Sequence, residues 1–83
     1  MSTKEQVRVV LRDVLQLGSR AQDLEASTEL LGNLAELDSM AVATVITALE
    51  DRFEMMIDDD EISAETFETF GSLCKFIEMK QAA

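Results

Sequence analysis

The sequence of 83 residues contains no histidine, tryptophan, tyrosine or proline, and only one cysteine and three glycines. Without histidine the chain lacks the side chain that most often serves as a general base near neutral pH. The single cysteine, Cys74, therefore has no imidazole to activate it, and it cannot form a disulfide within the chain. Since no acid and base are paired at a catalytic spacing, we predict a non-enzymatic protein with Cys74 as a small core residue.

Basic residues are also scarce, with 7 lysines and arginines against 17 acids and a net charge of −10. This charge argues against nucleic acid as a partner and favours basic protein surfaces. No apolar run is long enough to span a membrane, and Arg8, Arg12 and Asp13 interrupt the first apolar residues, which argues against a signal peptide. We therefore expect one domain over residues 1–83, monomeric and cytoplasmic.

The apolar residues that are present follow helical spacing in the first part of the chain. Ser2 with Glu5, and Thr3 with Gln6, form two overlapping capping boxes, and Gly18 offers a stop, so we predict a helix over residues 3–17. Residues 19–38 show no sustained period and are predicted to form a long loop. The loop is expected to bury its leucines, which are Leu24, Leu30, Leu31, Leu34 and Leu37.

Three more helices are predicted after this loop. Residues 39–53 have the clearest helical period, and the acids of residues 58–61 suit the N-terminus of a short helix over residues 59–66. A last helix, capped by Thr69, follows with Phe70, Leu73, Phe76 and Ile77 on one side. The expected fold is an all-α four-helix bundle with a long first loop and a short third helix.

Ser39 stands at the first position of the predicted helix over residues 39–53. Serine and aspartate are ordinary helix caps, so Asp38-Ser39 alone favours a structural cap. However, the reciprocal acid of a capping box is missing, because Ala41 and Val42 stand three residues after Asp38 and Ser39. Capping alone therefore does not account for the pattern.

In their context these residues resemble a discrete acyl carrier protein. The resemblance rests on Asp38-Ser39-Met40, Ala48-Leu49-Glu50, Phe53 and Ile57, and on a second signature, Phe67-Glu68-Thr69 followed by Leu73. It implies a covalent 4′-phosphopantetheine on Ser39, flanked by Asp38 and Met40, whose thiol carries an acyl group as a thioester. The implied partners are a phosphopantetheinyl transferase and an acyl-activating ligase or acyltransferase. The cargo stays open between acyl, aminoacyl and malonyl-type groups.

The same helix offers acids for docking. Glu50, Asp51 and Glu54 are predicted to be exposed and to meet basic patches on partner enzymes. Ala41 and Thr44 stand where fatty-acid carriers of this family present acids, which indicates a specialised type served by a dedicated ligase. Lys4, Arg8 and Arg12 form a basic stripe, interpreted as a solvated face or a secondary docking patch.

Two other functions compete with that of a carrier. An EF-hand starting at Asp58 fails, because Ser63 stands where glycine is required and Thr69 occupies the twelfth position, so no metal site is predicted. An acidic helical adaptor, which would bind a basic partner without any prosthetic group, remains the alternative function. Met55 and Met56 could line a binding groove, although filling gaps in the core is the ordinary role of methionine.

Overall fold

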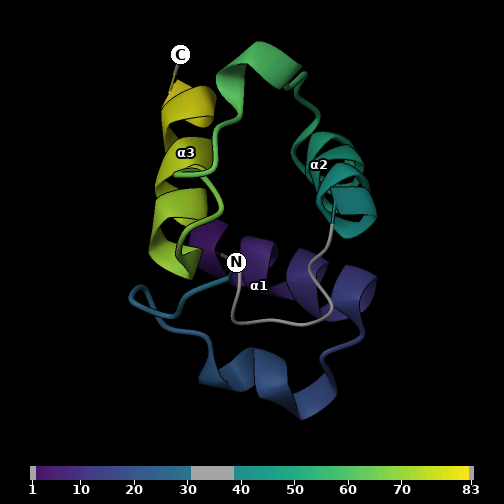
Figure 1. Ribbon diagram of the computed structural model, residues 1–83, viewed down its shortest axis with the longest axis vertical. Coiled ribbons are helices and arrows are strands. Elements are labelled where there is room, and N and C mark those ends of the chain that lie inside the picture. Colours follow the sequence, from purple (N-terminus) through teal and green to yellow (C-terminus); the bar gives the residue numbers. More distant parts are fainter. Residues whose placement is uncertain (1, 31–38, 83) are drawn as a thin grey trace.

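The computed structural model describes residues 2–30 and 39–82, which form three α-helices and two 3-10 helices (Figure 1). The elements follow in the order α1 (Thr3–Leu15), η1 (Gly18–Asp23), α2 (Ser39–Phe53), η2 (Asp59–Glu61) and α3 (Phe70–Ala82). The described residues contain no strand, only an isolated bridge between Glu29 and Thr69. The prediction of an all-α fold is confirmed.

Helix α1 begins where the capping residues predict and ends earlier than expected. Ser2 is the N-cap, and its hydroxyl accepts from the backbone N–H of Glu5 at 3.2 Å. The helix ends at Leu15 because Gln16 adopts the left-handed conformation with φ of 54°, and Leu17 then donates to the carbonyl of Arg12. Gln16 thus ends the helix in place of Gly18, which has φ of 59° and begins η1.

The segment predicted as a long loop contains the 3-10 helix η1 and a stretch that pairs with the start of α3. Leu30 donates its N–H to Glu68, and Phe70 donates to Thr28. Gly71 donates to the carbonyl of Ala26, and a Cβ on Gly71 would lie 2.6 Å from that oxygen. This close approach requires glycine. Leu24 and Leu30 are buried as predicted, whereas Leu31, Leu34 and Leu37 lie outside the described residues.

Helix α2 has its predicted bounds, and Glu54, with φ of 51°, ends it. The predicted helix over residues 59–66 is wrong in its extent. It is the three-residue η2 followed by turns, in which Thr66 donates to the carbonyl of Ser63 and Glu68 to that of Glu65. Thr69 caps α3 as predicted: its hydroxyl accepts from the N–H of Ser72, and the Ser72 hydroxyl accepts from the N–H of Thr69.

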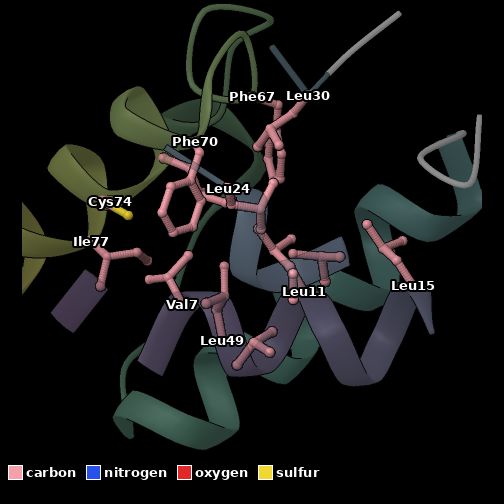
Figure 2. Close-up of a cluster of buried hydrophobic side chains, with 14 of the residues drawn as sticks. Val7, Leu11, Leu15, Leu24, Leu30, Leu49, Phe67, Phe70, Cys74 and Ile77 are labelled. Atoms are coloured by element: carbon pink, nitrogen blue, oxygen red, sulfur yellow. The ribbon is translucent and has the colours of Figure 1, made fainter. Parts of the chain in front are cut away.

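The core forms around α1, against which α2 and α3 both pack, and η1 and the segment before α3 add to it (Figure 2). Cys74 is buried as predicted, and its burial raises the pKa of the thiol to about 11, with a smaller effect from the Glu78 carboxylate. Such a thiol is a poor nucleophile at neutral pH. The buried apolar residues are Val7, Val10, Leu11, Leu15, Leu17, Ala21, Leu24, Leu30, Val45, Leu49, Ile57, Phe67, Phe70, Leu73, Cys74 and Ile77.

The side chain of Arg8 is largely buried, whereas the interpretation of the basic stripe as a solvated face predicts that it is exposed. Its side chain is only 19% exposed, and its guanidinium donates to the carbonyl oxygens of Gln22 at 3.4 Å and Leu24 at 3.1 Å. The same guanidinium lies over the ring of Phe70, 5.6 Å from its centroid. Arg8 therefore fastens the end of η1 to α1 and to the core.

Candidate functional site

The candidate attachment residue, Ser39, is the first residue of α2. Backbone N–H groups at the start of a helix have no partners within the helix, and the helix dipole is positive there. The first turn of α2 contains no acidic residue that would offset this potential. A phosphodiester on Ser39 fits this position, because an anion there is stabilised by the helix N-terminus. Asp38, the predicted neighbour, lies outside the described residues.

Met40 lies beside the serine, and its side chain is 80% exposed. An exposed, flexible thioether can provide an apolar contact without a fixed shape. Thr44 is exposed one turn later, and its hydroxyl donates to the carbonyl of Met40 at 3.1 Å. Ala41, in contrast, is half-buried and packs against the core. Of the two positions where the sequence lacks the expected acids, only Thr44 therefore lies on the open surface.

The three predicted docking acids have different surroundings. Asp51 and Glu54 are exposed at the end of α2, as predicted. The prediction that Glu50 is exposed is wrong: it is half-buried, and its Oε2 accepts from the backbone N–H of Ile57 at 2.9 Å. Glu50 therefore holds the chain after α2 in place. The helical period of the sequence could not predict this hydrogen bond, because the bond depends on how the chain after α2 folds back to bring Ile57 close to Glu50.

An open groove of about 460 Å³ runs along α2 and the segment that leads to η2. Most of its lining residues are apolar, and Thr47 and Glu50 are the polar ones. Such a surface can shelter apolar atoms from water. No pattern in the sequence indicates this groove, because α2 and the segment at residues 57–62 come together only in the tertiary structure. The lining residues are Val42, Ala43, Ile46, Thr47, Glu50, Ile57 and Ile62.

A second carboxylate fastens this segment to α3. The Lys80 ammonium donates to both oxygens of Glu61, at 2.7 and 2.8 Å, and Glu61 also accepts from the backbone N–H of Asp58 at 3.0 Å. These hydrogen bonds lower the pKa of the Glu61 carboxyl, and the bond from Lys80 has the largest effect.

The two neighbouring methionines have different surroundings. Met55 packs against the core, whereas Met56 is 79% exposed, so the expectation of a core role is wrong for Met56.

Acidic residues do not gather into a metal site in the part of the chain that the structure describes, where no three histidine, cysteine, aspartate or glutamate side chains converge. Among these described residues, every helix is too short or too polar to be a membrane span.

Comparison with known proteins identifies the family. The family model described as a phosphopantetheine attachment site matches residues 5–77. The chain belongs to the acyl carrier protein family. It is 32% identical to an acyl carrier protein of Exiguobacterium sibiricum over 92% of this chain and 95% of the relative. It is also 31% identical to an acyl carrier protein of an Exiguobacterium species, covering 94% of this chain and 98% of the relative.

A solved structure extends the comparison to the fold. The solution NMR structure of a holo acyl carrier protein from Nitrosomonas europaea superposes with a TM-score of 0.92 and is 59% identical, with complete coverage of both chains. Members of this family are non-catalytic carriers with a 4′-phosphopantetheine prosthetic group. The family therefore favours the carrier over an adaptor that has no prosthetic group. It also implies encounters with a phosphopantetheinyl transferase and with enzymes that handle acyl groups.

Proposed function

We propose that this protein carries an acyl group as a thioester on 4′-phosphopantetheine attached to Ser39, and that it moves this group between partner enzymes. The observation that carries the proposal is the position of Ser39 as the first residue of α2, in a chain of the acyl carrier protein family. We further propose that it acts in the cytoplasm as a monomer. These two points rest on the charge and composition of the sequence.

Attachment requires a nucleophile that a partner activates. A phosphopantetheinyl transferase with Mg²⁺ would activate the Ser39 hydroxyl, which attacks the pyrophosphate of coenzyme A. The phosphopantetheine phosphate then forms a phosphodiester with Ser39, the serine proton passes to a base of the transferase, and adenosine 3′,5′-bisphosphate leaves. The role of this chain is to present the hydroxyl and to stabilise the anionic product at the start of α2.

The surface along α2 suggests where the cargo binds and which residues contact partner enzymes. The groove along α2 begins at Val42, one turn after Ser39, and we propose that apolar cargo rests in it between transfers. Met40 and Asp51 are exposed on α2 and Glu54 is exposed directly after it, and these three are the proposed contacts for partners. The acids would steer a basic docking surface and raise the encounter rate more than the affinity.

The first prediction tests the attachment residue. The wild-type protein, incubated with coenzyme A and a broad-specificity phosphopantetheinyl transferase, should gain the mass of one phosphopantetheine, and Ser39→Ala should gain none. Ser63→Ala, which removes an exposed serine elsewhere, is the matched control and should be modified like the wild type. Circular dichroism should show the same helical content for all three proteins. Modification of Ser39→Ala would refute the site, and an unmodified wild type would favour the adaptor.

A further inference from the structure

The basic residues are concentrated in the first quarter of the chain. Residues 2–22 contain four cations, Lys4, Arg8, Arg12 and Arg20, and only two acids, whereas the rest of the chain has three cations and fifteen acids. Salt screens charges over about 10 Å at 0.1 M ionic strength, so the local charges decide what binds at a given surface. This first part of the molecule can therefore attract an anion although the net charge is −10.

Two of these cations line a cleft of about 490 Å³ between α1 and η1, here called the α1–η1 cleft. Arg8 and Arg12 are one turn apart, so they share a face of α1. Figure 1 shows η1 on the side of α1 away from α2, which separates this cleft from the groove along α2. The lining residues are Glu5, Arg8, Val9, Arg12, Gly18, Ala21 and Gln22.

Arg8 provides a fixed positive charge in the cleft. Its hydrogen bonds to Gln22 and Leu24 go to neutral carbonyl oxygens, which hold the guanidinium in place without neutralising it. The nearest carboxylate oxygen in its ion pair, on Glu5, lies 3.9 Å away, beyond hydrogen-bonding distance. The buried Nε–H of Arg8 has no acceptor among the residues that the structure describes. The positive charge is thus only loosely compensated.

Arg12 completes the pair from a more open position. Its side chain is 49% exposed, and it donates through Nε to the neighbouring Asp13 at 3.2 Å. The tetrahedral oxygens of a phosphate carry more negative charge than a carboxylate and can accept from both guanidiniums at once. We propose that the α1–η1 cleft binds the phosphate group of a small molecule, either inorganic phosphate or a phosphate monoester. The cleft is larger than a phosphate, and the half-buried Val9 offers apolar surface to the rest of a monoester.

The test follows the arginine Nε–Hε signals by NMR while the full-length protein is titrated with inorganic phosphate or with adenosine 5′-monophosphate at constant ionic strength. Saturable shifts at Arg8 and Arg12 are expected. Arg12→Gln should weaken binding about tenfold, the scale of one charge-assisted hydrogen bond. Arg20→Gln removes the same charge outside the cleft and should leave the affinity within about twofold. Tighter binding of the monophosphate would identify an organic ligand, and equal binding would identify inorganic phosphate.

A second pair of variants keeps the proposal falsifiable if Arg12→Gln loses its fold. Glu5→Gln removes the carboxylate that competes for Arg8 and should tighten phosphate binding severalfold, whereas Asp23→Asn, the same charge change outside the cleft, should not. Linear shifts without saturation, or equal effects of the cleft and control variants, would overturn the proposal. Binding of a hexaglutamate peptide in preference to both phosphates would also overturn it, and would identify an acidic protein surface as the occupant.

Discussion

At the scale of single residues, Glu50 shows how a surface acid can have a structural role. Its carboxylate accepts from the Ile57 N–H at the point where the chain leaves α2, while Asp51 beside it is exposed. Both are acids on the same helix and both are predicted docking residues. The structure separates them, because one of the two carboxylates satisfies a partly buried backbone donor.

The Glu50 bond makes a prediction about stability. Glu50→Ala should lower the free energy of unfolding by about 1–2 kcal/mol, because the Ile57 N–H loses a charged acceptor. Asp51→Ala, which removes the same charge from the exposed neighbour, should change it by less than about 0.5 kcal/mol. Urea unfolding monitored by circular dichroism measures both. Equal effects of the two variants would show that the bond to Ile57 contributes nothing.

Thr44 leads to a prediction about partner choice. Of the two positions that lack the expected acids, Thr44 is exposed and Ala41 packs against the core, so an acid can be introduced without disturbing packing only at Thr44. The wild-type holo protein should be a poor substrate for general fatty-acid synthase enzymes and a good one for a dedicated acyl-activating ligase. Thr44→Glu should raise the elongation rate by the synthase, with the larger gain at low salt.

Thr44→Gln is the control for this comparison, since it changes the size of the side chain without adding charge. The rate of elongation is measured for the three proteins at low and moderate salt. Efficient elongation of the wild type, or the same rates for Thr44→Glu and Thr44→Gln, would mean that the missing acid does not determine the partner.

At the scale of elements, the stretch at residues 57–62, between α2 and α3, is held by two carboxylates. Glu50 fastens it to α2, and Glu61 fastens it to α3 through Lys80. Ile57 and Ile62 of this segment form one side of the groove along α2. The width of the groove therefore depends on two polar contacts as well as on the apolar core beneath.

The Glu61–Lys80 pair predicts a pH dependence of stability. The folded state lowers the pKa of Glu61, so the pair stabilises the protein above the pKa of an unfolded glutamate, and this contribution is lost as the pH falls through the lower, folded pKa. At neutral pH Glu61→Gln should melt at a lower temperature than the wild type, and the difference should vanish in acid. Glu65→Gln, at an exposed acid in the following turns, is the control. A difference that persists unchanged in acid would contradict this explanation.

At the scale of the whole molecule, the charge of −10 is unevenly distributed, with a net positive first quarter and fifteen acids in the rest. Like charges repel in the folded state, and they repel less in the extended unfolded chain. Electrostatics therefore opposes folding of the acidic part, and the apolar core around α1 must offset it.

This imbalance predicts a dependence on salt. The melting temperature should rise with sodium chloride from low ionic strength to about 0.2 M, where the Debye length falls below about 8 Å and screening has weakened the repulsion. Magnesium or calcium should act at lower concentrations without saturating at one ion per protein. A melting temperature that stays flat across the series, or one-to-one calcium binding, would refute this explanation.

The proposed monomeric state is tested separately. In size-exclusion chromatography the protein should elute as a monomer at every salt concentration.

The sequence alone determined the elements whose signals are local. The caps at Ser2 and Thr69 and the apolar period of α2 predicted where three helices begin, because capping and helical spacing involve residues within one or two turns. The position of Ser39 at the start of α2 was predicted in the same way. The resemblance to the family came from the residues around that start and from the second signature at Phe67-Glu68-Thr69, although attachment at Ser39 itself stays a prediction.

Only the tertiary structure decided the features that depend on long-range contacts. The turns that replace the predicted third helix and the contact of Gly71 with Ala26 depend on where distant segments meet. The hydrogen bond from Ile57 to Glu50 and the burial of Arg8 beneath η1 also depend on contacts between separate segments of the chain. No local pattern encodes them, because each needs a hydrogen-bonding partner or a steric neighbour that folding brings from another part of the chain.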